Sequence, residues 1–182
     1  ETLAGQMRSS VMLLGPLLAR LGRVETSLPG GCRIGKRPVD LHIRGLTELG
    51  AVVRIEDNRI RAEAPPAGLL GAEIHLPYPS VGATENILMA AAGARGETVL
   101  VGAAREPEIG ILCSFLKAMG VSVEGAGSSV IRVRGTGSFR DSRFSLPGDR
   151  IVAGTITANE IAAAAILANN IAAGAITTEK IA

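Results

Sequence analysis

The chain has 182 residues, a length that normally folds as a single domain, and its formal net charge is only +2. A charge this small argues against binding to nucleic acid or to an anionic membrane surface, and no apolar run reaches the about 20 residues that span a bilayer. Two cysteines are too few for a disulfide framework, so we expect a reduced, cytoplasmic setting.

The first predicted element is a helix over residues 7–21. Its apolar residues recur at helical spacing, and they are Val11, Leu14, Leu18 and Leu21. Pro16 lies inside this stretch and is expected to kink the helix, because proline has no N–H to donate. Residues 25–28 are predicted to be extended and lead into a loop.

Residues 28–42, LPGGCRIGKRPVDLH, place Cys32 in a loop that glycine and proline keep out of regular structure. Three cationic side chains follow the cysteine closely, and they are Arg33, Lys36 and Arg37. Nearby cations favour the reactive thiolate, and the helix that Pro38 is expected to start favours an anion near Arg37. The pattern indicates a reactive sulfur beside a phosphate or carboxylate site. An incidental cysteine on a charged surface loop is the alternative.

The next predicted helix covers residues 39–49, with Leu41, Leu46 and Leu49 inward and Gly50 as its stop. Residues 51–56 and 59–63 alternate apolar and polar side chains around Asp57-Asn58, which predicts a β-hairpin.

The second half of the chain repeats this pattern. Strands are predicted at 72–76, 98–101, 121–124 and 130–134, and helices at 80–92 and 107–119. The order is β-α-β-α-β-β, and the preceding segment reads as the same unit without its first strand. We therefore predict an α/β fold with an internal repeat. Cys113 lies on an apolar helix stripe and is expected to be core.

From residue 151 the composition changes, which predicts two parts, 1–150 and 151–182. Isoleucine recurs at every fifth position from Ile151 to Ile181, within a repeat ten residues long. A period of five does not match the α-helical period of about 3.6, so the tail is not a simple amphipathic helix. It resembles the decapeptide repeats of phage tail-fibre proteins, which associate as trimers. A flexible alanine-rich tail and a fused reading frame are the alternatives.

Five segments together resemble the UDP-N-acetylglucosamine enolpyruvyl transferases of the MurA type, in that family's order. They are MRSSVMLLGPLLARLG, SLPGGCRIGKRPVDLHIRGLTELGA, PSVGATENILMAAA, AAREPEIGILCSFLKAMG and GDRIVAGT, and they cover about residues 7–155. The resemblance implies part of an inside-out α/β barrel of βαβαββ units. It also implies transfer of enolpyruvyl from phosphoenolpyruvate to the 3-hydroxyl of UDP-N-acetylglucosamine in peptidoglycan synthesis, with no cofactor or metal.

The resemblance also implies roles for individual residues. Cys32 would be the acid or covalent residue that fosfomycin alkylates, and Arg8 and Arg37 would bind the phosphoenolpyruvate anions. The uracil end of the nucleotide sugar would contact Pro38, Val39, Asp40 and Leu41. The uridine diphosphate would lie along Ser80, Val81 and Gly82 at a helix start, where phosphate binding is favoured. Ser80 also fits a plain N-cap, and both roles can hold at once.

The chain departs from the family pattern in ways that limit its expected activity. The lysine–asparagine pair near the family's N-terminus, the aspartate taken as base and the second-domain arginines are absent. We therefore expect this chain to form one wall of a site between two domains and to turn over little or nothing alone. His42 is expected to be structural, and the role of Arg150, which matches a family arginine, stays open. A structural protein that oligomerises through its tail is the second hypothesis, and a shikimate enzyme is disfavoured.

Overall fold

The computed structural model describes residues 8–28 and 39–147. The chain divides into two compact units, Glu1–Phe144 and Ser145–Ala182, and the description that follows concerns the first. The predicted boundary at residue 150 and the isoleucine repeat lie outside the described residues.

The first half of this unit is a three-stranded antiparallel sheet with helices. Its elements are η1 (Arg8–Leu13, a 3₁₀ helix), α2 (Leu14–Leu21), β1 (Arg23–Ser27), α3 (Asp40–Glu48), β2 (Val52–Glu56) and β3 (Arg59–Glu63). The strand order is β1-β3-β2. Asp57 and Asn58 both have positive φ, 50° and 59°, as the tight turn of a hairpin requires. The predicted hairpin is therefore confirmed.

The second half contains β4 (Glu73–His75), α4 (Val81–Gly93), β5 (Glu97–Val101), α5 (Pro107–Ala118), β6 (Ser122–Glu124) and β7 (Val130–Arg134). Its strand order is β4-β5-β7-β6, with β4 parallel to β5 and the other pairs antiparallel. The order β5-β7-β6 reproduces β1-β3-β2. The predicted βαβαββ repeat and the α/β class are confirmed.

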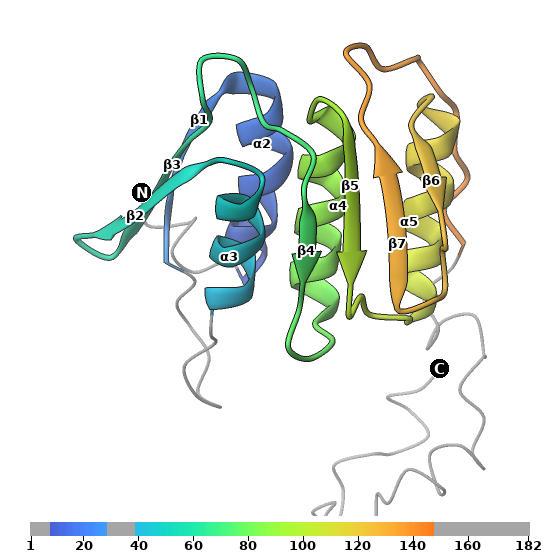
Figure 1. Cartoon of the computed structure of the whole chain (residues 1–182), viewed down its shortest axis with the longest axis horizontal. Coiled ribbons are helices and arrows are strands. Elements are labelled where there is room, and N and C mark those ends of the chain that lie inside the picture. The colour runs from blue at the N-terminus through green and yellow to red at the C-terminus, as the bar shows by residue number, and fades with distance from the viewer. Residues whose placement is uncertain (1–7, 29–38, 148–182) are drawn as a thin grey trace, which may run out of the picture. The chain divides into compact units, whose positions relative to one another are not determined.

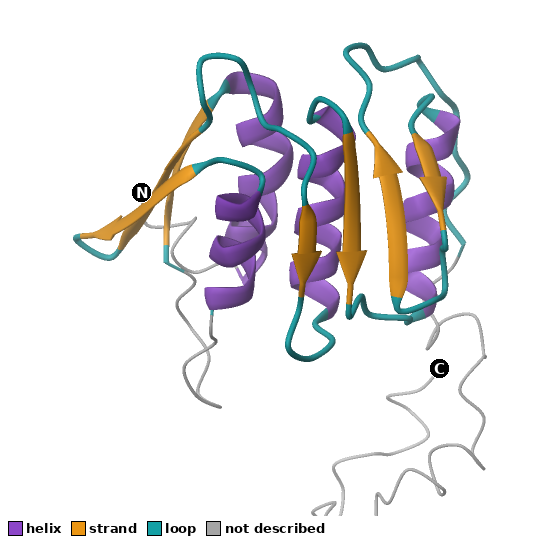
Figure 2. Cartoon of the chain, viewed as in Figure 1, coloured by secondary structure: helices purple, strands orange, loops and turns teal. Residues whose placement is uncertain are grey.

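Helices cover one face of the four-stranded sheet and leave the other face open (Figure 2). Leu100, Ile131 and Val133 point toward the helices and are buried. Arg132 and Arg134, which alternate with them on β7, are exposed. The strands of this sheet therefore present a polar face on one side and helices cover the other, an arrangement that is consistent with the predicted partial inside-out barrel.

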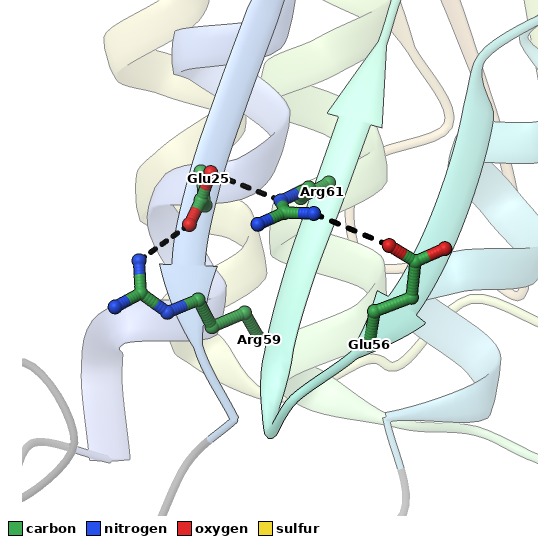
Figure 3. A network of polar contacts seen from close by, with 4 residues as sticks. All are labelled: Glu25, Glu56, Arg59 and Arg61. Carbon is green, nitrogen blue, oxygen red and sulfur yellow. Dashed lines mark hydrogen bonds and ion pairs between the residues drawn. The ribbon is translucent and has the colours of Figure 1, made fainter.

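The outer face of the three-stranded sheet carries a network of ion pairs (Figure 3). Glu25 on β1 accepts hydrogen bonds from Arg59 at 2.6 Å and from Arg61 at 3.1 Å, both on β3. Arg61 also donates to Glu56 on β2 at 3.2 Å. These side chains link all three strands on the solvent side, where ion pairs contribute little each.

The central helix is α4, which packs against α2, α3, α5 and strands of the second sheet. Most of its residues are buried: Ala83, Thr84, Asn86, Ile87, Leu88, Ala90, Ala91 and Ala92. Glycines let its neighbours approach closely. A Cβ added at Gly45 on α3 would lie 2.3 Å from Cδ1 of Ile87, and one at Gly93 would lie 2.9 Å from Cβ of Ala19 on α2.

The first predicted helix is wrong in one respect. It is not a continuous α-helix, because α2 begins at Leu14 after the 3₁₀ turn, which places Pro16 in the first α-helical turn, where its missing N–H costs nothing. Leu21, the last of the four apolar residues at helical spacing, is 62% exposed. Ala19 already lies opposite Gly93, the last residue of α4, so Leu21 extends beyond the helix that covers the stripe.

Candidate functional site

The N-terminal ends of α3, α4 and α5 lie at the same end of the first unit (Figure 1). The first N–H groups of a helix have no partner within the helix, and the helix dipole gives that end a partial positive charge. This end of the fold therefore favours anionic groups, and it is the end to which the predicted binding residues belong.

The start of α3 carries three of the predicted residues. Val39 precedes the helix, and its carbonyl accepts a hydrogen bond from the Ile43 amide at 3.0 Å. Asp40 is exposed in the first turn, whereas Leu41 is buried with 5% of its surface exposed. A ligand here could meet the Asp40 side chain, but it could reach Leu41 only through the backbone.

The start of α4 carries the other three, Ser80, Val81 and Gly82. Ser80 is extended, with φ −140° and ψ 117°, and its hydroxyl accepts from the Ala83 amide at 3.4 Å. The predicted N-cap is therefore confirmed. All three residues are half-buried, so the helix start remains partly open to solvent.

The two helix starts are neighbours in space. His42 follows Leu41 directly, and the edge of its ring lies against Gly82. A Cβ at Gly82 would lie 3.4 Å from Cε1 and 3.5 Å from Nε2 of His42, and 3.4 Å from the Met12 sulfur. The structure thus brings the 39–41 and 80–82 segments together, although about forty residues separate them in the sequence.

A buried asparagine joins three segments beneath these helix starts. Asn86 on α4 accepts at Oδ1 from the Gly15 amide at 2.6 Å. Its Nδ2 donates to the Val11 carbonyl at 3.1 Å and to Nδ1 of His42 at 3.0 Å. Burial lowers the pKa of His42, and the charge of Asp40 only partly opposes this. Burial therefore favours the neutral imidazole.

Asn86 is not among the residues predicted from the sequence, and His42 is predicted only to be structural. A signal for Asn86 exists in the sequence, because this amide directly precedes the apolar run ILMAAA and shares a face of the predicted helix with Ala83 and Ala90. Buried polar side chains need hydrogen-bond partners, so such a residue indicates a network with other segments.

The carboxyl group of Glu85 lies at the same end, near that of Glu108. Glu85 lies on α4 and Glu108 in the first turn of α5. Burial raises the pKa of Glu85, and the negative charge of Glu108 raises it further. Thr84 links α4 to the loop that precedes α5, since its hydroxyl accepts from the Ala104 amide at 3.1 Å.

The remaining predicted residues fall largely beyond what the structure describes. Cys32, Arg37 and Pro38 lie outside the described residues, and Arg8 is the first residue of η1, with its side chain outside them too. Cys113 is fully buried, as predicted, and burial raises the pKa of its thiol.

Among residues 8–28 and 39–147, no three His, Cys, Asp or Glu side chains gather as a metal site. In the same ranges, no helix is long and apolar enough to span a membrane.

The sequence profile of the EPSP synthase (3-phosphoshikimate 1-carboxyvinyltransferase) family matches residues 1–181. Two curated relatives are named UDP-N-acetylglucosamine 1-carboxyvinyltransferase. The protein of Rhodospirillum centenum is 56% identical over 84% of this chain and 35% of its own length. The protein of Maricaulis maris is 53% identical over 84% of this chain and 36% of its own length. The chain thus spans about a third of these relatives.

Solved structures of enolpyruvyl transferases share the fold. The enzyme NikO of Streptomyces tendae matches with a TM-score of 0.62 at 22% identity, over 75% of this chain and 32% of that one. The EPSP synthase of Acinetobacter baumannii matches with a TM-score of 0.62 at 23% identity, over 82% of this chain and 34% of that one.

Proposed function

Because this chain belongs to the EPSP synthase family of enolpyruvyl transferases, we propose that it forms part of a UDP-N-acetylglucosamine 1-carboxyvinyltransferase. In that reaction the enolpyruvyl group of phosphoenolpyruvate moves to the 3-hydroxyl of UDP-N-acetylglucosamine and phosphate leaves, a step of peptidoglycan synthesis. The observation that carries the proposal is the meeting of the α3 and α4 starts, in a chain up to 56% identical to relatives of that name.

The nucleotide sugar is proposed to lie across these two helix starts. Its diphosphate would be placed at Ser80, Val81 and Gly82. There the N-terminus of α4, a helix of 13 residues, offers N–H donors and a favourable dipole. Its uracil end would be placed along residues 38–41. The exposed Asp40 carboxylate suits an N–H donor such as the uracil imide rather than a phosphate, which agrees with this orientation.

The chemistry would come from the loop that precedes α3. Enolpyruvyl transfer needs cations for the phosphate and carboxylate of phosphoenolpyruvate, an acid near the vinyl carbon and a base for the sugar hydroxyl. Arg8 and Arg37 are proposed as the cations and Cys32 as the acid or covalent residue. None of the proposed residues supplies the base, so the chain alone is expected to form one wall of the site.

Fosfomycin labelling tests the proposed role of Cys32. The Cys32 thiolate would attack an epoxide carbon of fosfomycin, form a C–S bond and break a C–O bond, and the released alkoxide would take up a proton. Mass spectrometry of the full chain should find the adduct on Cys32, formed faster with UDP-N-acetylglucosamine present. Cys113 is an internal control, because its fully buried thiol should stay unlabelled until the protein unfolds. Equal labelling of both cysteines, or none, would contradict the proposal.

Turnover tests the proposal that the chain is one wall of the site. The purified chain should release almost no phosphate from phosphoenolpyruvate and UDP-N-acetylglucosamine, although it binds the nucleotide sugar. Phosphate release at the rate of a full-length relative would show that the chain holds a complete site.

Two further proposals concern assembly and location. The isoleucine repeat of residues 151–182 is proposed to promote homo-oligomers, and light scattering of the whole chain against a chain ending at residue 150 tests this. A mass equal to the monomer for both chains would contradict it.

A cytoplasmic location is proposed because phosphoenolpyruvate and nucleotide sugars are cytoplasmic metabolites, and fractionation of cells that express the tagged chain would test it.

A further inference from the structure

Both the oxygen and the nitrogen of the Asn86 side-chain amide have hydrogen-bond partners inside the protein. It is fully buried on the central helix α4. The Gly15 backbone N–H can only donate, so the atom that faces it at 2.6 Å must be the amide oxygen. The amide nitrogen therefore faces the Val11 carbonyl, which can only accept, at 3.1 Å. Two backbone groups of fixed character thus set the orientation of this side chain without ambiguity.

This orientation determines the protonation of His42. The second N–H of the Asn86 amide donates to Nδ1 of His42 at 3.0 Å, so Nδ1 must be an unprotonated acceptor. A neutral imidazole carries one proton, which must then be on Nε2. Burial lowers the pKa of His42, which keeps the ring neutral near pH 7. The ring is thereby held as the Nε2–H tautomer.

The Nε2–H group lies at the junction of the two helix starts. The ring edge formed by Cε1 and Nε2 borders Gly82, and the whole residue is 8% exposed. Within the described ranges, 8–28 and 39–147, Nε2 has no hydrogen-bond partner, whereas Nδ1 does. Gly82 has no side chain that could cover this ring edge, so a ligand at the start of α4 can approach it.

We infer that Asn86 is a positioning residue that holds His42 as a neutral Nε2–H donor to a phosphate oxygen of the nucleotide sugar at the start of α4. The inference rests on the proposed function for the identity of the ligand, but the tautomer follows from the hydrogen bonds alone. A donor fixed before binding needs no reorganisation when the phosphate arrives. The same hydrogen bonds also tie α2, α3 and α4 together, so the test must separate positioning from stability.

The first experiment reads the tautomer of the full chain by nitrogen NMR of ¹⁵N-labelled histidine. The chain has only two histidines, and the exposed His75, whose Nε2 lies 2.7 Å from Oε1 of Glu73, is the internal reference. Nε2 of His42 should give a protonated-type resonance and Nδ1 an unprotonated one. The opposite pattern, or a mixture of tautomers, would overturn the inference whatever the ligand is.

The second experiment replaces the side-chain amide of residue 86 by a carboxyl group of nearly the same shape. Asn86→Asp replaces the N–H donor by an acceptor, so Nδ1 of His42 should become protonated. Thr84→Val is the matched control, because it removes a buried hydrogen bond of the same helix that does not involve His42. The tautomer should remain unchanged in Thr84→Val. An unchanged tautomer in a folded Asn86→Asp chain would contradict the inference, and the wild-type spectrum decides the tautomer even where the variant does not fold.

The third experiment measures binding of UDP-N-acetylglucosamine by calorimetry and by the same NMR signals. In the wild type, Nε2 of His42 should shift on titration while His75 stays unchanged. Asn86→Asp should weaken binding about tenfold or more, as expected for the loss of a hydrogen bond to a charged group. Tight binding with no Nε2 shift, or equal affinity of wild type and Asn86→Asp, would overturn the inference alone. No binding by the wild type, with the tautomer as stated, would overturn the proposed function instead.

Discussion

At the scale of single residues, the approach of α2 to α4 depends on a position that has no room for a side chain. A Cβ at Gly15 would lie 2.2 Å from the backbone oxygen of Asn86 and 2.5 Å from its Oδ1. Backbone cannot move aside as a flexible side chain can, so the two helices would have to separate. The same glycine donates the hydrogen bond that orients Asn86.

We therefore predict that Gly15→Ala destabilises the fold by about 1–3 kcal/mol, the usual cost of overpacking a core. Urea unfolding followed by circular dichroism would measure this. Gly110→Ala is the matched control, since a Cβ there meets nothing within 4 Å and the residue lies inside α5. The control should be neutral or slightly stabilising, because alanine favours helix over glycine. Equal effects of the two substitutions would contradict this account of Gly15.

The buried histidine predicts how stability depends on pH. The pKa of His42 is lower in the fold than its ordinary value of 6.5, because burial disfavours the charged ring. The unfolded chain therefore binds a proton more readily than the fold. The contribution of His42 to stability is complete above pH 6.5 and is lost as the pH falls through the pKa of the folded state.

Unfolding free energies measured between pH 8 and pH 5, about the range in which histidine titrates, would test this. The wild type should lose stability toward pH 5, and His42→Gln should lose less. An equal loss of stability in the wild type and in His42→Gln would contradict the prediction.

At the scale of elements, α3 and α4 meet through a glycine on one helix and a branched side chain on the other. A Cβ at Gly45 would lie 2.3 Å from both Cγ1 and Cδ1 of Ile87, and Leu46 beside it is fully buried. This contact is close to the His42–Asn86 hydrogen bond, so the same packing sets the distance between the two helix starts. Loss of the fit would therefore disturb the candidate site as well as the core.

A double-mutant cycle tests this packing. Gly45→Ala alone should cost about 1–3 kcal/mol by overpacking, and Ile87→Ala alone about 2–5 kcal/mol by leaving a cavity. The double variant should cost clearly less than the sum, because the new methyl group occupies part of the space that Ile87 vacates. Additive costs would show that the two side chains do not compete for the same space.

At the scale of the whole molecule, the first unit is two copies of one supersecondary motif that share a single central helix. Both halves bury apolar residues against α4, including Leu18 on α2, Leu46 on α3 and Ile109 on α5. Neither half would bury its own apolar surface alone. The unit Glu1–Phe144 should therefore unfold as one cooperative transition.

Thiol exposure tests this cooperativity. In a Cys32→Ser chain, Cys113 on α5 is the only thiol, and it is fully buried. Its reactivity toward a thiol reagent in a urea series should rise with the same midpoint as the loss of helical circular dichroism. A thiol transition at clearly lower urea would mean that the second half opens before the first.

Apart from the 3₁₀ start of the first helix, the sequence by itself determined the elements, their order and the internal repeat. These follow from local spacing: the alternation of β2 and β3, the Asp57-Asn58 turn, the Ser80 cap and the aliphatic stripe of α5 all arise within a few residues. It also determined the family, because whole segments of the chain match in order.

The tertiary structure alone decided which of these segments meet. Asn86 lies 71 residues from Gly15, 75 from Val11 and 44 from His42, and only the packing of η1, α2 and α3 against α4 brings these residues within hydrogen-bond distance. The exposure of Leu21 likewise depends on where α4 ends. Periodicity shows which face of a helix is apolar, but the neighbour that covers this face, and how far along it, is set by contacts between distant parts of the chain.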